Sequence, residues 1–381
     1  MKQEAFSVST VPTPSVILDR QKLIANCRRM AARAAGAGVK LRPHLKTAKS
    51  AEVAALATSG QFGGITVSTL AELRYFFEHG IRDMTYAVGI TPGKMPVIEG
   101  FIEQGAVIRI VLDSAGMVDE LAARESGFKG RVPVLIEIDC GGHRAGVAAE
   151  GVELLDIARR IAGVPGLVLD GVLTHAGHSY HAADAGAREA IAVAERDAAV
   201  LAAGRLREAG HACPTVSIGS TPTALTGIAL DGVTEIRPGV YVFFDLAQAA
   251  LGVCSPDDIA VSVVATVIGQ HRAAGHLLID AGALALSKDT SAGEFRQHVG
   301  YGLVCDLEGR LLDGMHVADA HQEHGFVRCS AGTIDFDRFP VGSRLRILPN
   351  HACMTVAPYP EYQVFESMDR PLVQWSKTTG W

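Results

Sequence analysis

The feature that most constrains this chain is the alternation, over its first two-thirds, of short apolar runs with stretches rich in Ala, Leu and Glu. The runs have the length and composition of buried strands, and the stretches between them have helical composition. Strands are predicted at residues 39–42, 64–67, 84–87, 107–112, 132–138, 167–174, 215–218 and 235–240. Helices are predicted at residues 19–35, 69–78, 115–124, 152–162 and 185–209. Eight strands separated by helices predict a (β/α)8 barrel of the TIM type.

The predicted strands are apolar without a regular alternation, which is typical of parallel strands that are buried on both faces. A doubly wound sheet is the alternative arrangement for such strands. It would have fewer strands and usually a glycine-rich phosphate loop after the first one. No such loop follows residues 39–42, so the pattern favours the barrel.

The helical pattern fades after about Phe243, and a second domain is expected there. Strands divided by Gly, Asp and Pro turns are predicted at residues 259–268, 276–280, 303–306, 324–329 and 343–348. The extended segment 11–18 could pair with these strands before Asp19 caps the first helix. We therefore expect a barrel over residues 19–245 and a mostly-β domain over residues 246–381, joined by an N-terminal strand within residues 1–18.

The composition excludes several classes of function. The net charge is −6, so no basic field attracts nucleic acid or an anionic membrane. No apolar run is long enough to span a membrane, and residues 1–13 lack the apolar core of a secretory signal. The seven cysteines are scattered without a CxxC pair, which argues against a disulfide framework. A soluble, cytoplasmic protein without nucleic-acid or membrane partners is the expectation.

A basic segment at residues 41–49 ends the first predicted strand, on the face where barrel enzymes place catalytic residues. It contains two lysines, Lys46 and Lys49, and Lys49 is expected to face the following helix. Positive neighbours destabilise an ammonium group and so favour the free amine that forms imines. The alternative is a solvated basic loop.

The segment resembles the RPHxKTxK signature of the D-serine dehydratase and D-threonine aldolase family, fold-type III pyridoxal-phosphate (PLP) enzymes related to alanine racemase. Further segments in the family's order carry the resemblance, at residues 64–69, 137–146, 174–180, 219–223, 235–241 and 349–355. The resemblance spans nearly the whole chain and implies an alanine racemase-like fold. It also implies that Lys46 carries PLP.

The resemblance and the barrel geometry together predict the rest of the cofactor site. Gly219, Ser220 and Thr221 follow the seventh strand, where barrels commonly bind phosphate, and Gly239 and Tyr241 could close the same pocket. The alternative is an ordinary Ser/Thr turn that caps a helix.

Three further residues take their roles from the resemblance alone. It places Arg144 near the pyridine nitrogen, His175 against the pyridine ring and Tyr180 close by. A structural role at the barrel rim is the alternative for His175 and Tyr180. Within residues 322–325, His324 is expected to approach the substrate, and the alternative is a hairpin turn at the surface.

His351 and Cys353 are the predicted metal ligands. In an extended segment, residues two apart project to the same face, and a His/Cys pair suits zinc. The flanking residues match the family's metal motif. Zinc is the first expectation, with manganese, cobalt and magnesium as alternatives. The family's dehydratases typically pair histidine with cysteine, whereas its best-known D-threonine aldolases pair histidine with aspartate.

The expected activity is therefore that of a PLP- and metal-dependent lyase on D-β-hydroxy-α-amino acids. Dehydration of D-3-hydroxyaspartate or D-serine to a 2-oxo acid and ammonia is the first expectation. Retro-aldol cleavage to glycine and an aldehyde is the alternative, ahead of racemisation, which would need a second catalytic base. A PLP-binding protein without catalysis is the hypothesis from another class, but such proteins lack the C-terminal domain. The resemblance also implies a head-to-tail homodimer.

Overall fold

The computed structural model describes residues 6–124, 127–294 and 299–381. Residues 1–5 of the predicted N-terminal segment lie outside the described residues. The chain divides into two compact units. The barrel unit comprises residues Arg28–Gly239 and Gly380–Trp381, and the β unit comprises Met1–Cys27 and Val240–Thr379.

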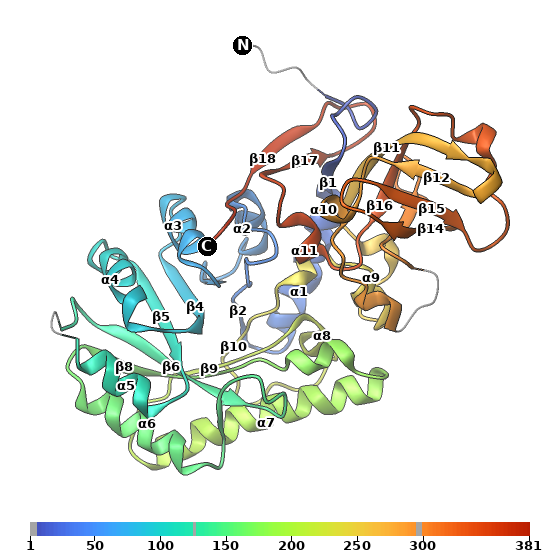
Figure 1. Cartoon of the computed structure of the whole chain (residues 1–381). Coiled ribbons are helices and arrows are strands. Elements are labelled where there is room, and N and C mark those ends of the chain that lie inside the picture. The colour runs from blue at the N-terminus through green and yellow to red at the C-terminus, as the bar shows by residue number, and fades with distance from the viewer. Residues whose placement is uncertain (1–5, 125–126, 295–298) are drawn as a thin grey trace. The chain divides into compact units, whose positions relative to one another are not determined.

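The barrel unit contains the predicted eight parallel strands (Figure 1). They are β2 (Lys40–Leu41), β3 (Ile65–Val67), β4 (Asp83–Gly89), β5 (Val107–Leu112), β6 (Val132–Asp139), β8 (Leu167–Thr174), β9 (Thr215–Ile218) and β10 (Glu235–Ile236). β10 pairs with both β9 and β2, and a parallel bridge between His44 and Thr66 joins the end of β2 to β3. A short strand, β7 (Val147–Ala148), pairs only with β6. The predicted fold class is confirmed.

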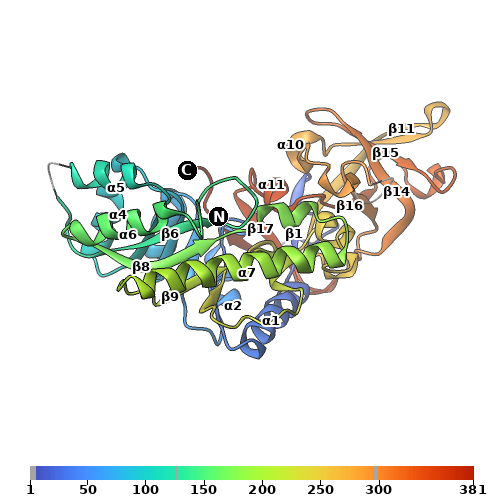
Figure 2. The same cartoon turned by 90° about the horizontal axis from the view of Figure 1, so that it is seen from below.

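Helices alternate with these strands, as predicted. They are α2 (Ala51–Ala57), α3 (Leu70–Glu78), α4 (Met95–Glu103), α5 (Ala115–Ala122), α6 (Val152–Gly163), α7 (Ala185–Glu208) and α8 (Thr221–Ala224). The side chains of Thr69, Ser114 and Asp184 each accept a backbone N–H in the first turn of α3, α5 and α7, which explains why these helices begin there. The long helix α7 packs against β8 and β9 (Figure 2).

The β unit is built on a mainly antiparallel sheet. Its strands are β1 (Ser15–Asp19), β11 (Val261–His271), β12 (His276–Ile279), β13 (Leu303–Cys305), β14 (Leu311–Ala320), β15 (Gly325–Cys329), β16 (Arg344–Leu348), β17 (Glu361–Phe365) and β18 (Val373–Ser376). The helices are α9 (Leu246–Ala250), α10 (Ala283–Leu286) and α11 (Ala352–Val356). Pairing of β12 with both β11 and β15 closes six of the strands into a small barrel.

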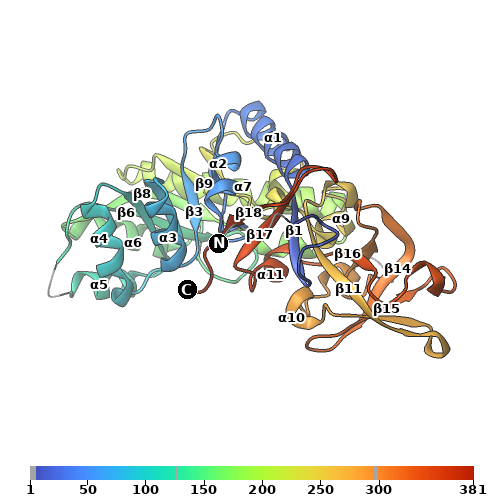
Figure 3. The same ribbon diagram turned by 90° about the horizontal axis from the view of Figure 1, so that it is seen from above.

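The predicted pairing of the N-terminal segment is confirmed, because β1 lies between β11 and β17 (Figure 3). Helix α1 (Arg20–Gly36) then begins where predicted, and the Asp19 carboxylate accepts the N–H groups of Gln21 and Lys22. Strands β14, β17 and β18 were not predicted. In the parts of the chain that the structure describes, no helix has the length and apolar composition needed to cross a membrane.

Candidate active site

A cavity of about 350 Å³ opens at the carboxyl ends of the barrel strands. Its lining includes Glu137 on β6 and residues that follow different strands, namely His44, Lys46, Ser68, Arg144, His175, Gly219 and Arg237. All of them belong to the barrel unit. The cavity therefore brings together four predicted cofactor residues (Lys46, Arg144, His175 and Gly219) with charged groups of both signs.

Lys46 and Lys49 have different surroundings in this loop. The Nζ of Lys49 lies 3.2 Å from a carboxylate oxygen of Glu72 on α3, so Lys49 faces a helix, as predicted. Lys46 is exposed and lines the cavity. Its loop is held by the Leu45 N–H, which donates to the Thr66 carbonyl. Lys46 is consequently the lysine that a ligand in the cavity would meet.

The two histidines of the cavity are held neutral. Burial, followed by the charge of Lys46, lowers the pKa of His175 to about 3. The same two causes lower the pKa of His44 well below its usual value. The Nδ1 of His175 lies 3.1 Å from the Gly219 carbonyl oxygen, which can only accept, so Nδ1 carries the proton and Nε2 is unprotonated. Positive charge in the cavity therefore comes from lysine and arginine.

Arg144 lies in the loop that joins β6 to β7. Its guanidinium is 3.5 Å from the Glu137 carboxylate, and its side chain is 62% exposed, so this contact holds it loosely. Burial raises the pKa of Glu137. The loop needs Gly146 at φ +100°, because a Cβ there would lie 2.6 Å from the backbone nitrogen of Asp139.

The turn after β9 has the geometry of a helix start. Gly219 has φ +115°, and a Cβ there would lie 3.1 Å from the backbone nitrogen of Arg237. Ser220 caps α8, because its hydroxyl accepts the Thr223 N–H at 3.2 Å. Thr221 is fully buried. The capping alternative is thus present, and the phosphate role of this turn stays a prediction.

Sequence reasoning missed Glu195, which ties two loops of the cavity together. This buried carboxylate on α7 accepts the N–H groups of Ala176 at 2.7 Å and Gly219 at 3.2 Å, and the Thr223 hydroxyl at 2.7 Å. It thereby fixes the loops that carry His175 and Gly219. A signal existed, because Glu195 is spaced in register with the buried alanines of its helix.

The remaining predicted residues lie in different places. The Tyr180 ring is 6.4 Å from that of His175. Gly239 contacts the first loop closely, since a Cβ there would lie 2.9 Å from the His44 carbonyl oxygen. Tyr241 is fully buried in the β unit and is not among the residues that line the cavity. His324 is exposed in the turn between β14 and β15, so the hairpin alternative describes its position.

His351 and Cys353 contact each other in the β unit, but not along a strand as predicted. His351 is extended and precedes α11, whereas Cys353 lies within that helix. The expectation of a shared strand face is therefore wrong. The pair still meets, because the thiol is within hydrogen-bonding reach of the imidazole. Asp245, which sequence reasoning also missed, fixes the helix start by accepting the Ala352 N–H at 3.0 Å.

A carboxylate contacts the imidazole of His351. The Asp289 carboxylate lies 2.7 Å from Nδ1 of His351, and this contact lowers the pKa of Asp289. It fixes the ring so that Nε2 is the nitrogen left to bind an ion, as in many metal sites. Across residues 6–124, 127–294 and 299–381, no group of three or more His, Cys, Asp or Glu side chains is arranged to hold a metal. The donor set on the chain is a nitrogen and a sulfur, which suits zinc.

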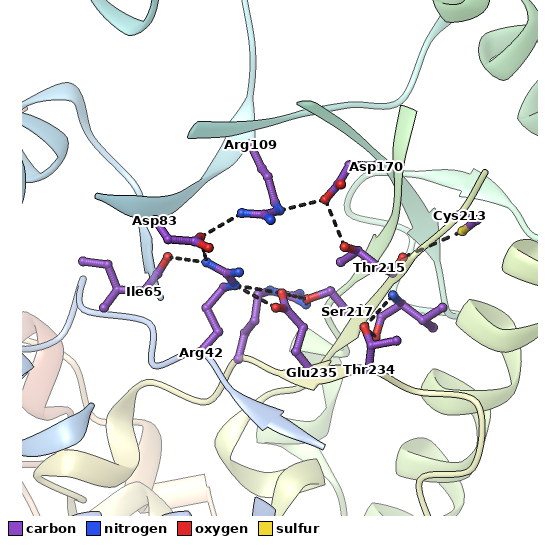
Figure 4. A network of polar contacts seen from close by, with 12 residues as sticks. Arg42, Ile65, Asp83, Arg109, Asp170, Cys213, Thr215, Ser217, Thr234 and Glu235 are labelled. Carbon is purple, nitrogen blue, oxygen red and sulfur yellow. Dashed lines mark hydrogen bonds and ion pairs between the residues drawn. The ribbon is translucent and has the colours of Figure 1, made fainter. Parts of the chain in front are cut away.

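A network of charged groups links side chains from several strands of the barrel unit (Figure 4). Arg42 contacts Glu235 at 2.8 Å and Asp83 at 2.5 Å. Arg109 contacts Asp83 at 2.8 Å and Asp170 at 2.7 Å. We call these five residues the base network. Sequence reasoning did not find it, because its members are far apart in the chain.

Known protein families match both the N-terminal and the C-terminal part of the chain, and a known enzyme is similar over nearly its whole length. Residues 18–247 match the alanine racemase N-terminal domain family, and residues 260–365 match a serine dehydratase domain. The chain is 45% identical to the D-threo-3-hydroxyaspartate dehydratase of Delftia sp. (strain HT23) over 98% of both proteins. The solved structure of that dehydratase superposes with a TM-score of 0.95 at 44% identity, covering 99% of this chain and all of the other.

Two further relatives are enzymes with other activities. Identity to the D-serine dehydratase of Dictyostelium discoideum is 30% over the full length of both proteins. Identity to the D-threonine aldolase of Arthrobacter sp. is 29% over 92% of this chain and 88% of the aldolase. With relatives this similar over its whole length, the chain belongs to the family of enzymes that join an alanine racemase N-terminal domain to a serine dehydratase domain.

Proposed function

We propose that this enzyme is a PLP- and divalent-metal-dependent lyase that removes water from a D-β-hydroxy-α-amino acid, such as D-3-hydroxyaspartate or D-serine, to give a 2-oxo acid and ammonia. The observation that carries the proposal is the Lys46 amine at a cavity whose two histidines are held neutral and whose arginines are charged. An amine in such surroundings can bind an anionic carbonyl cofactor and accept a proton.

The cavity fits PLP in size and chemistry. Its volume lies in the range of small-molecule sites. Gly219 and Gly239 keep the backbone of two loops close to neighbouring strands, where side chains would intrude. Arg144 and Arg237 supply positive charge for a phosphorylated ligand. When bound, PLP accepts electrons from the amino acid and so acidifies its Cα–H bond.

The chain's own residues then have distinct tasks. Lys46 would hold the cofactor through Nζ and, once the substrate's amine has displaced it, its free amine would take the Cα proton as general base. His175, held neutral with its Nδ1–H on the Gly219 carbonyl, would pack against the cofactor ring. The backbone of residues 219–221 and Gly239 would bind the phosphate, and Arg144 would serve the pyridine nitrogen.

Three site residues keep their roles only through the family resemblance. Tyr180 and Tyr241 are proposed as cofactor contacts, and His324 as a group that approaches the substrate. Because Tyr241 is fully buried, its contribution would be to support the loop that carries Gly239.

The metal is proposed to bind His351 and Cys353, with zinc as the first candidate. Bound there, it would act as a Lewis acid on the β-hydroxyl and make hydroxide a better leaving group. The chain contributes Asp289, which orients the His351 ring, and Asp245, which fixes the first turn of α11. Manganese, cobalt and magnesium are the alternatives.

Water loss is placed ahead of carbon–carbon cleavage on two grounds. The relative at 45% identity is a dehydratase, and the aldolase relatives are more distant. The second ligand position carries the sulfur of Cys353, whereas the family's best-known aldolases carry aspartate. Retro-aldol cleavage is the second candidate, because D-threonine aldolase aligns over most of the chain.

Product analysis tests the proposal. The protein is incubated with PLP, with zinc or manganese, and separately with D-threo-3-hydroxyaspartate, D-serine or D-threonine. We expect ammonia and a 2-oxo acid in equal amounts, and we expect a chelator to abolish the reaction. Glycine and an aldehyde as the main products would establish the aldolase instead. Turnover of neither kind, despite bound PLP, would favour a binding protein.

A homodimer is also proposed, from the resemblance alone. Sedimentation equilibrium of the PLP-loaded protein would give a mass of two chains if this is right, and of one chain if it is wrong.

A further inference from the structure

We propose that Ser217 and Glu235 are positioning residues that hold Arg237 toward the cavity, with the Ser217 hydroxyl as a spacer between the two charged side chains. The inference rests on the proposed function, because it concerns how the cavity receives an anionic cofactor. Arg237 lines the cavity and is 5% exposed, yet no role follows for it from the sequence.

The three side chains form a continuous chain of hydrogen bonds. Glu235 accepts from the Arg42 Nε with both of its oxygens, at 2.9 and 2.8 Å, and from the Ser217 hydroxyl at 2.6 Å (Figure 4). Arg237 donates to the Ser217 oxygen at 2.5 Å and to the Thr174 carbonyl at 2.5 Å. Ser217 is fully buried, so no solvent competes for these bonds.

The direction of the serine proton is determined by its neighbours. A carboxylate can only accept a hydrogen bond and a guanidinium can only donate one. Ser217 therefore gives its one proton to Glu235 and offers its lone pair to Arg237. No other placement of the serine proton satisfies all three groups. The Ser217 oxygen therefore acts as an acceptor toward Arg237 and orients its guanidinium.

The Ser217 hydroxyl also lies between the Arg237 guanidinium and the Glu235 carboxylate, so the two charges are not in direct contact. Arg42 contacts two carboxylates directly. Within the described residues Arg237 forms no ion pair, and its side chain donates to a hydroxyl and a carbonyl oxygen. Burial lowers the pKa of Arg237 to about 10, so it remains charged at neutral pH. A positive charge that is held in place without a contacting carboxylate is available to an anionic or electron-rich ligand.

Arg42, Arg109 and Arg237 are matched in number by Asp83, Asp170 and Glu235 in this part of the barrel unit. Glu195 and Glu137 also act on Arg237, although neither forms an ion pair with it in the described residues. If Ser217 lost its hydroxyl, Arg237 would keep one of its two bonds and could turn toward Glu235. The cavity would then lose positive potential without any change in the number of charges.

The test compares Ser217→Ala with Thr215→Val. Thr215 lies two residues earlier on β9 and donates to Asp170 at 2.9 Å, so Thr215→Val also removes one hydroxyl, partly buried, that bonds to the base network. The PLP-free proteins are titrated with PLP, and the dissociation constant and the absorbance maximum of the bound form are recorded. We expect affinity to fall about tenfold in Ser217→Ala and to change less than twofold in Thr215→Val. Ser217→Thr, which keeps a hydroxyl, should restore part of the affinity.

Glu235→Gln provides a second variant if Ser217→Ala does not fold. Its amide would compete for the serine lone pair, so the same loss of affinity and the same spectral shift are expected. Equal PLP affinity and equal spectra in Ser217→Ala, Thr215→Val and the unmodified protein, all folded, would overturn the inference. Absence of PLP binding in the unmodified protein would instead refute the proposed function, so the two failures are distinguishable.

Discussion

The base network and the cavity of the barrel unit both contain basic side chains, but these side chains are paired with carboxylates to different extents. In the base network, Arg42 and Arg109 each contact two carboxylates, and the Arg42 side chain is only 2% exposed. At the cavity, Lys46 is exposed, Arg144 contacts Glu137 only at 3.5 Å, and Arg237 bonds to neutral oxygens. Direct pairing therefore identifies cations that stabilise the fold, and weak or indirect pairing identifies cations that serve a ligand.

The largest effect is expected from Lys46→Ala. This variant removes the proposed general base and cofactor attachment, so turnover should fall by about a thousandfold or more. Because the side chain is exposed, the free energy of unfolding of the PLP-free protein should change by less than about 0.5 kcal/mol. Steady-state rates and urea unfolding measure the two quantities. Lys49→Ala is the matched control, and equal losses of turnover in both variants would contradict the assignment.

Arg42→Met should instead lower the free energy of unfolding, which Lys46→Ala is expected to leave nearly unchanged. It leaves the Glu235 carboxylate buried without the Arg42 Nε–H that both of its oxygens accept, and breaking such a buried pair costs about 3–5 kcal/mol. Urea unfolding of the PLP-free protein measures this loss. Arg109→Met is the control, because Asp83 and Asp170 are partly exposed and can be hydrated, so a smaller loss is expected. Equal losses would show that burial does not distinguish the two pairs.

The sequence predicted the architecture well because strand and helix periodicity is local. Strands β5, β8 and β9 have the predicted bounds. Strand β10 is shorter than predicted, since Pro238 has no N–H to continue the ladder. The start of α11 depends on Asp245, 107 residues away from Ala352, so no local pattern could reveal that Cys353 is helical. Glu235 and Arg42 are likewise joined only by barrel closure, 193 residues apart.

Asp289→Asn extends the comparison to the β unit. There the Asp289 carboxylate contacts His351, a proposed metal ligand, whereas the carboxylates of the base network contact arginines. Loss of a carboxylate behind a metal-binding histidine typically lowers metal affinity about 10–100-fold. Competition with a chelator, using zinc alone as the probe, measures this change. Asp319→Asn, beside the exposed His321, is the control and should leave the affinity unchanged. A normal zinc affinity in Asp289→Asn would remove the support for His351 as a ligand.

A further expected effect concerns acid stability. Folding lowers the pKa of His175 to about 3, whereas the unfolded chain has a value of about 6.5. The unfolded state therefore binds more protons between these values, and the free energy of unfolding falls as pH is lowered from about 6.5 to about 3. His175→Asn should reduce this slope in urea unfolding of the PLP-free protein. His321→Asn, at an exposed site, should not. An unchanged slope in His175→Asn would mean that His175 is not held neutral.

The central claim is that the exposed Lys46 amine at the cavity of the barrel unit holds the cofactor, and one measurement tests it directly. The protein is incubated with PLP, reduced with borohydride, digested and mapped by mass spectrometry. The reduced pyridoxyl group is predicted on Lys46, in equal amount to the protein chain. A label on Lys49 or another lysine, or no label at all, would contradict the account.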